Sequence, residues 1–369
     1  MELNRITQKV QDARITEKQY RSLKDRLSYS SLKLYDNDRA SFFKQLILGE
    51  TPKEKTSFAL VLGSLIHCLL SGEDCFDSKF HLLSAIEPVG QMKLLCDNLV
   101  ERTFKTLDDE GRQMDSFETL FGDAFLATKF DAAGKEVNFK GKTVEKALEL
   151  FSNKDPELYY RECIDARGKM TITASALDFA ENTIIKKLRE HPFSADIVNA
   201  QTSGEVEVFN ELPILFDIEE VPFKSMIDKL IVNHGTKTIQ PYDYKTSWDS
   251  ESPENSYIKH SYYLQSGLYN VAIGEWAKEH KLENYLISPM SFVFIDTNGF
   301  NAPIVLTLTQ NDLDRAMRGF VYRTYKYAGV NEIINSIAWN LETGNWTTTK
   351  TIYENNGIVP LRIAYGSRN

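Results

Sequence analysis

The sequence has few cysteines and no long apolar run. Its 369 residues include four cysteines, none in a Cys-x-x-Cys spacing, which argues against a zinc ribbon or a disulfide framework and favours reduced thiols. No stretch approaches the roughly 18 apolar residues of a membrane span. The N-terminus, with Asn4, Arg5 and Asp12, lacks the apolar core of a signal peptide. We therefore expect a cytoplasmic protein that does not enter a membrane.

Positive charge is also in short supply. The formal net charge is −9, although hydrophobic residues make up 42% of the chain, ample for a packed core. Residues 1–60 differ, with 12 Lys and Arg against 8 Asp and Glu. This local excess is either a solvated helix face or a surface that meets nucleic acid, and composition leaves both open.

Periodicity predicts an α/β protein with a mixed central sheet flanked by helices. Helical spacing covers much of the N-terminal half, including an apolar helix over 58–70, and returns over 257–280 and 312–337. Strand-like runs begin after Gly204, at 206–209, 223–232, 238–244, 291–295 and 304–308. The pattern suggests four parts: an N-terminal helical segment (1–86), a helical insertion without strands (87–200), a core of sheet and helices (201–340) and a tail whose structure it does not indicate (341–369).

Asp243 and Lys245 stand two residues apart at the end of a strand-like run, so strand periodicity places them on one face. An Asp-x-Lys triplet arises by chance in a chain of this length, and its context gives it weight. The preceding strand carries Asp228 among apolar neighbours, where an unpaired charge is costly. A shared metal ion would satisfy both acids, whereas the alternative is a pairing of Asp228 with Lys224 or Lys229 at a strand edge.

A third carboxylate is expected one strand earlier. Glu207 is the preferred candidate, and Glu205, on the same face, is its rival. His67 follows Gly63 by four residues, so both occupy one helix face, and we expect His67 to contact a metal or a phosphate rather than to be an ordinary core histidine. The carboxylates in this set are hard oxygen ligands, which suit Mg²⁺, and Mn²⁺ can substitute for it.

The helix after the Asp-x-Lys strand presents Gln265 and Tyr269 on one face. An amide and a phenol at this spacing are suited to hold a phosphate, a base edge or the lysine. Alone, the pair would carry no information.

Together these motifs resemble the PD-(D/E)XK nuclease superfamily, specifically the phage and prophage RecE-like exonuclease branch, related to the RecB nuclease domain and lambda exonuclease. The serine segment 27–33, the Gly63 to His67 helix, a glutamate, Asp228 in a K-x-x-h-D strand, Asp-x-Lys and Q-x-x-x-Y occur in the order of that branch. Ile227 stands where the superfamily name has proline. The resemblance covers roughly residues 20–275 and implies a restriction-endonuclease-like fold.

The resemblance also implies a mechanism and partners. Asp228, Asp243, Glu207 and His67, with the backbone carbonyl of Tyr244, would hold one or two Mg²⁺ ions beside Lys245, which positions or deprotonates the attacking water. Gln265, Tyr269, Ser28 and Ser31 would hold the substrate strand. We expect 5′ to 3′ digestion of double-stranded DNA ends to mononucleotides, leaving a 3′ single strand for recombination, with a single-strand annealing protein and a homo-oligomeric ring as further expectations.

Other functions stay open at this point. One is a nuclease similar to RecB or to the CRISPR-adaptation nucleases, with another polarity or with endonuclease activity. Another is an inactive nuclease fold that binds DNA or protein as an inhibitor. An iron-sulfur cluster is not expected, because no cysteine follows Cys163.

Overall fold

A computed structural model describes residues 15, 17–50, 57–72, 76–107 and 110–359. The chain divides into two compact units: unit 1 is Met1–Thr56 with Lys187–Asn369, and unit 2 is Ser57–Lys186. The sequence suggested an insertion from residue 87 to 200. Unit 2 instead begins at Ser57, so it includes the helix that carries Gly63 and His67. Within the described ranges, no helix is both long enough and apolar enough to cross a membrane.

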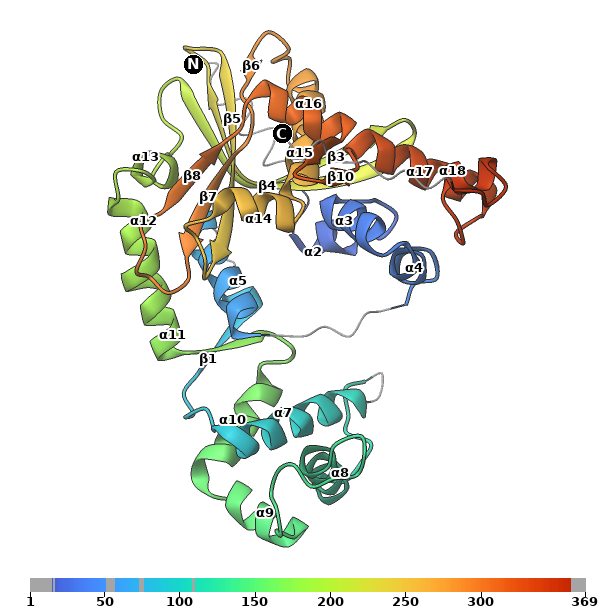
Figure 1. The fold of residues 1–369 in the computed structure, drawn as a ribbon. Helices are drawn as coiled ribbons and strands as arrows, with labels where there is room; N and C mark the ends of the chain where they lie inside the picture. The colour runs from blue at the N-terminus through green and yellow to red at the C-terminus, as the bar shows by residue number, and fades with distance from the viewer. Residues whose placement is uncertain (1–14, 16, 51–56, 73–75, 108–109, 360–369) are drawn as a thin grey trace, which may run out of the picture. The chain divides into compact units, whose positions relative to one another are not determined.

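Unit 1 is built on a mixed six-stranded sheet, drawn as arrows among its helices in Figure 1. The strand order is β3-β4-β5-β7-β8, and β6 pairs with β5. Antiparallel pairing joins β3 to β4, β4 to β5 and β7 to β8, whereas β5 pairs in parallel with β6 and β7. The bounds are Val206–Ile218 (β3), Val221–Asn233 (β4), Thr238–Ser247 (β5), Leu286–Ile287 (β6), Ser291–Asp296 (β7) and Ile304–Thr307 (β8). The predicted class, a mixed sheet flanked by helices, is confirmed.

The long helix α15, Tyr262–Glu279, packs on β3 and β4 and also contacts α16 and α17. It is buried around most of its circumference because sheet and helices enclose it. Gly267 permits this packing, since a Cβ there would lie 3.0 Å from Val330 Cγ2 and 3.2 Å from Met317 Sδ. The close approach fixes α15 over the sheet and so positions Gln265 and Tyr269. The neighbouring helices are α14 (Pro253–Lys259), α16 (Gln310–Arg318), α17 (Val330–Thr343) and α18 (Lys350–Glu354).

The predicted single helix over 312–337 is wrong, because a hairpin interrupts it. Helix α16 ends at Gly319, whose φ of +88° lies in the left-handed region that favours glycine. Strands β9 (Phe320–Tyr322) and β10 (Tyr325–Tyr327) follow and pair antiparallel before α17 begins. Gly319 and Gly329 close the hairpin, since a Cβ on Gly329 would lie only 2.2 Å from the Gly319 nitrogen. Amphipathic spacing on both sides concealed this break.

The N-terminal part of unit 1 contributes helices and one strand-like contact. Its helices are α2 (Glu17–Ser22), α3 (Tyr29–Asn37), α4 (Arg39–Phe42) and the π-helix η1 (Phe43–Ile47). Between α2 and α3, Leu27 makes a parallel bridge to Phe223 of β4. Leu32 and Phe42 then bury their side chains in the core of the sheet. This contact holds the serine segment against β4.

Unit 2 is mainly helical, but the prediction that this part of the chain has no strand is wrong. Strands β1 (Phe80–Leu83) and β2 (Met170–Thr173) pair in parallel. Four helices enclose a separate core: α7 (Gly90–Lys105), α8 (Phe117–Lys129), α9 (Val144–Phe151) and α10 (Lys154–Asp165). The other elements are α5 (Phe58–Ser71), α6 (Phe76–Lys79), α11 (Ala174–Asp178) and the π-helix η2 (Phe179–Ile185), while α12 (Lys186–Glu190) and α13 (Ala195–Val198) lead into the sheet.

The cysteines differ from the prediction in one respect. Cys96 and Cys163 are buried free thiols. Cys68 is disulfide-bonded, so the prediction of four reduced thiols is wrong for this residue. Cys75 lies outside the described residues.

Candidate metal site

Strands β4 and β5 separate at the position where the sequence places its acids. Their last paired residues are Lys229 and Tyr242, and the next residues along are Asp228 and Asp243. Beyond this point β4 pairs with Leu27 instead: the Leu27 N–H donates to Pro222 O at 2.9 Å, and Leu27 O accepts from the Lys224 N–H at 2.8 Å. The separation makes room for side chains between strands that would otherwise be joined by backbone hydrogen bonds.

Asp228 occupies this opening. Its Oδ2 accepts a hydrogen bond from the Tyr244 N–H at 2.8 Å. The N–H and C=O of a strand residue point to the same edge, so the Tyr244 carbonyl also faces the side where Asp228 lies. That orientation agrees with the proposed ligand role of the carbonyl, which stays a prediction.

Asp243, Lys245 and Gln265 form a buried group beside it. Lys245 Nζ lies 2.6 Å from Asp243 Oδ2, and the Asp243 side chain is only 2% exposed. Gln265 donates its amide to Asp243 Oδ1 at 2.5 Å. The Lys245 ammonium also lies 4.7 Å from the centre of the Tyr262 ring. The Asp-x-Lys pair and the first residue of Q-x-x-x-Y therefore meet around one carboxylate.

Charge balance sets the protonation state of Lys245. Burial acts to lower the pKa of this lysine, but the nearby Asp243 and Asp228 carboxylates outweigh it, and the net pKa is raised above the usual 10.5. Lys245 is therefore an ammonium at neutral pH. In this state it donates hydrogen bonds and does not accept a proton.

Glu211 is the third acid at the opening, and sequence reasoning missed it. The pairs Asn210–Lys229 and Leu212–Ile227 flank it, so Glu211 lies directly across from Asp228. One oxygen from each of these two carboxylates lies within 4.8 Å of the other. Glu211 could have been found only by pairing β3 with β4 in this register and asking which residue then faces Asp228.

The backbone of Glu211 is unusual for its residue type. Its φ of +47° lies in the left-handed region, which costs a non-glycine residue about 1–2 kcal/mol. The alternation of buried and outward residues along β3 is broken here, because Phe209 and Leu212 both lie in the core although they are three residues apart. The local reversal turns Glu211 away from the core and towards Asp228.

Glu207, the predicted third acid, is not brought to this cluster. It pairs with Val232, four positions along β4 from Asp228. Its side chain is buried, and its Oε2 lies 3.5 Å from His234 Nε2, while His234 Nδ1 contacts the Tyr285 hydroxyl at 2.8 Å. The sequence places Glu207 on the strand before Asp228, but it does not reveal the reversal at Glu211 or the register that brings Glu211 across from Asp228. Glu205, its rival, is exposed.

The other predicted residues are placed as follows. Tyr269 is buried on α15, and burial together with the Asp243 charge raises the pKa of its phenol well above the usual value. Ser28 precedes the first turn of α3, and its N–H donates to Ser31 Oγ at 3.2 Å. His67 lies on α5 in unit 2. Its contribution to the site stays a prediction.

Helix α3 brings further groups towards the lysine. Tyr29 donates its hydroxyl to His260 O at 2.6 Å, which joins α3 to the end of α14. Burial and the Lys245 charge lower the pKa of Lys33. Burial and the charges of Lys33, Lys259 and Lys245 lower the pKa of His260. Lys33 and His260 therefore lie close enough to Lys245 to feel its charge, and the sequence analysis did not identify them.

The donor set determines which cation fits. Glu211, Asp228, Asp243 and the Tyr244 carbonyl offer oxygen atoms only, which suits a hard cation such as Mg²⁺. Carboxylate oxygens carry two lone pairs, so those of Asp228 and Asp243 that already accept hydrogen bonds retain coordinating capacity. The residues present therefore fit the cation that the sequence predicts.

The comparisons with known proteins add no relative to this description. No family model matches the sequence, and no curated protein is significantly similar to it.

Proposed function

We propose that this chain is a Mg²⁺-dependent DNA nuclease with a restriction-endonuclease-like core, similar to the RecE-like branch of the PD-(D/E)XK superfamily. The observation that carries the proposal is the convergence of Asp228, Asp243 and Lys245 at the opening between β4 and β5, with Glu211 across from Asp228. Acids that can hold a divalent ion, beside a largely buried lysine, are suited to hydrolysis of a phosphodiester.

Each residue has a distinct part. Glu211, Asp228 and Asp243, with the Tyr244 carbonyl, would hold the cation, and Glu207 is not among them. The role of His67 stays an expectation from the sequence. A bound divalent ion would activate water and offset charge on the scissile phosphate. Lys245, held as an ammonium by its neighbouring acids, would donate to the water or to a phosphate oxygen. Gln265 orients Asp243 through their hydrogen bond.

The substrate side of the proposal rests on the two lysines near the acids. Lys33 of α3 and Lys245 of β5 lie close enough for the charge of one to affect the pKa of the other. In a chain of net charge −9, such a pair is suited to hold the phosphates of a DNA strand. Digestion of duplex ends from 5′ to 3′, a ring-shaped assembly and an annealing partner are the further elements of this proposal.

The test is digestion of end-labelled duplex DNA with Mg²⁺ and with a chelator. We expect Mg²⁺-dependent release of nucleotides that falls about 10²-fold or more in Lys245→Ala. Lys278→Ala is the matched control, because its ammonium lies on the exposed face of α15 and pairs with Glu275. Equal activity of the two variants, or no activity in the wild-type protein, would refute the proposal. Linear and circular substrates in parallel distinguish an exonuclease from an endonuclease.

A further inference from the structure

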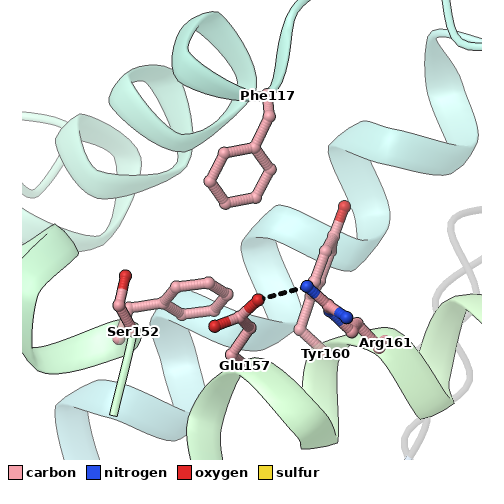
Figure 2. Close-up of a pocket in the computed structure, with 6 residues that line it drawn as sticks. Phe117, Ser152, Glu157, Tyr160 and Arg161 are labelled. Atoms are coloured by element: carbon pink, nitrogen blue, oxygen red, sulfur yellow. Dashed lines mark hydrogen bonds and ion pairs between the residues drawn. The ribbon is translucent and has the colours of Figure 1, made fainter. Parts of the chain in front are cut away.

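Unit 2 contains a small aromatic pocket that the proposed nuclease chemistry does not use. Figure 2 shows it between the start of α8, the end of α9 and the middle of α10. Its volume is about 220 Å³. The lining residues are Phe117, Phe151, Ser152, Glu157, Tyr160 and Arg161.

Three rings form the apolar part of this pocket. The centroid separations are 5.9 Å for Phe117 and Phe151, 6.0 Å for Phe117 and Tyr160, and 5.8 Å for Phe151 and Tyr160. Phe151 is almost fully buried and forms the floor, whereas Phe117 is 37% exposed at the rim. An aromatic ring that enters would meet ring edges and faces at the distances that aromatic pairs prefer.

The size of the pocket limits its occupant. Pockets for drug-sized ligands usually measure about 300–1,000 Å³, so 220 Å³ is room for a single large side chain. The polar groups at the rim are already paired, since Arg161 donates to Glu157 Oε1 at 2.5 Å. Because this carboxylate is neutralised, the pocket suits an uncharged ring better than an ammonium group.

Exposed apolar surface adjoins the rim. The Tyr160 hydroxyl contacts Thr103 Oγ1 of helix α7 at 3.0 Å. Thr106, which ends the same helix, accepts a hydrogen bond at its carbonyl from the Met114 N–H at 3.0 Å. Met114 is 71% exposed and Leu107 is 36% exposed. Apolar side chains gathered beside an open pocket are typical of an interaction site.

The surroundings are acidic, which decides between classes of partner. Residues 57–186 contain 22 Asp and Glu against 15 Lys and Arg, and the segment 110–118 beside the pocket contains three acids and one Arg. Such a field repels the phosphates of nucleic acid and attracts a basic polypeptide. A stacked base of single-stranded DNA would fit the rings but not the charge.

We propose that the aromatic pocket of unit 2 is a docking site for a basic segment of a partner protein, which inserts one aromatic side chain among Phe117, Phe151 and Tyr160. The flanking Lys and Arg residues of that segment lie over the acids of residues 110–118. The inserted ring supplies most of the affinity, and the charges supply orientation and salt dependence. This inference is independent of the nuclease proposal.

The test is fluorescence anisotropy with the full-length protein and labelled 12-residue peptides. The probe peptide has a central Phe with Lys on both sides; its partners replace the Phe with Ala or the Lys with Glu. We expect the Phe-Lys peptide to bind at least tenfold more tightly than either, since the Ala peptide has no ring to bury among the three aromatic residues and the acids of the protein repel the Glu peptide. Binding should weaken as salt is raised.

Three protein variants locate the binding. Phe117→Ala removes the rim ring and should weaken binding of the Phe-Lys peptide at least tenfold. Leu126→Ala is the matched control: Leu126 is 50% exposed and lies nine residues along α8, on the opposite face of the helix. Circular dichroism melting confirms that both variants are folded, and Phe117→Trp, which keeps a ring at the rim, should restore binding if Phe117→Ala is destabilised.

Several results would overturn the inference. No binding of the Phe-Lys peptide at millimolar concentration, equal binding of the Ala peptide, or equal effects of Phe117→Ala and Leu126→Ala would each do so. A labelled 12-nucleotide single strand that binds more tightly than the peptide and is weakened by Phe117→Ala would instead assign the pocket to DNA.

Discussion

Two buried carboxylates of the same sheet, Asp243 and Glu207, have very different surroundings. Asp243 has the Lys245 ammonium at 2.6 Å and the Gln265 amide at 2.5 Å. Glu207 is 1% exposed, and neither of its oxygens has a hydrogen-bond partner among the described residues, with His234 Nε2 at 3.5 Å. The difference follows from the strands: where β4 and β5 separate, side chains with donors fill the gap, and where they pair, backbone groups satisfy one another.

The lysines repeat the contrast. Neighbouring acids raise the pKa of Lys245, whereas burial lowers the pKa of Lys229, in the paired part of β4, to about 8. The Lys229 ammonium donates a hydrogen bond to Val198 O at 3.0 Å. Groups suited to chemistry are thus distinguished by their partners and not by burial alone.

The largest expected effect separates the two glutamates of β3. Glu211→Gln should lower Mg²⁺-dependent digestion about 10²-fold or more, because it removes charge beside Asp228. Glu207→Gln should change the rate less than about twofold, since Glu207 lies at the paired end of the sheet. Initial rates at saturating Mg²⁺ measure both. A larger loss of digestion rate in Glu207→Gln than in Glu211→Gln would contradict the assignment of Glu211 to the site.

Loss of a donor to Asp243 should destabilise the fold. Gln265→Leu leaves one oxygen of a buried carboxylate without its amide, and we expect the free energy of unfolding to fall by about 2–3 kcal/mol. Gln310→Leu makes the same change in an exposed pair with Asp314 at 3.2 Å and should cost less than about 0.5 kcal/mol. Urea titration gives both values, and similar costs would count against a special role of Gln265.

Removal of the isolated lysine should stabilise the protein at neutral pH. Lys229 has a folded pKa near 8, below the usual 10.5, so below about pH 8 it is charged in both states and the burial penalty is complete. Between these values the unfolded chain binds more protons, and stability rises with pH. Lys229→Met should raise the free energy of unfolding by about 2 kcal/mol at pH 7 and abolish that rise.

Urea titrations from pH 7 to pH 10.5 check this expectation, with Lys278→Met as a control at an exposed position. If Lys229→Met destabilises the protein at pH 7, the hydrogen bond to Val198 outweighs the burial cost and the contrast between the lysines fails.

The smallest effect concerns backbone strain at Glu211. Because its φ is +47°, Glu211→Gly should be about 1 kcal/mol more stable than Glu211→Ala. At Asn210, the neighbouring position without a positive φ, the order should reverse, since glycine in a strand is less favourable than alanine by roughly 0.5–1 kcal/mol. Thermal melts compare the stabilities of the four variants and so show whether the backbone of β3 is strained at Glu211.

The strands could be predicted from the sequence better than the site. Alternation located β4 and β5, and with them Asp228, Asp243 and Lys245, because period two is a local property. Glu211 could not be found this way: Asn210 and Glu211 have low strand propensity and resemble the end of a strand, yet pairing with β4 carries β3 on to Ile218. The left-handed turn that redirects Glu211 depends on that pairing and not on its neighbours in sequence.

Helices show the same limit. The hairpin between α16 and α17 interrupts a continuous amphipathic pattern, and only the close approach of Gly319 and Gly329 explains it. The contact of Tyr29 with His260 joins residues far apart in the chain, and no local pattern encodes it. Local periodicity therefore predicts elements, and long-range pairing determines which polar groups meet.

The most direct test of the central claim is a crystal soaked in Mn²⁺, with anomalous diffraction recorded above the manganese edge. We expect a peak bounded by carboxylate oxygens of Glu211, Asp228 and Asp243. A peak beside Glu207 and His234 instead, or none at Mn²⁺ concentrations that support digestion of DNA, would contradict the account.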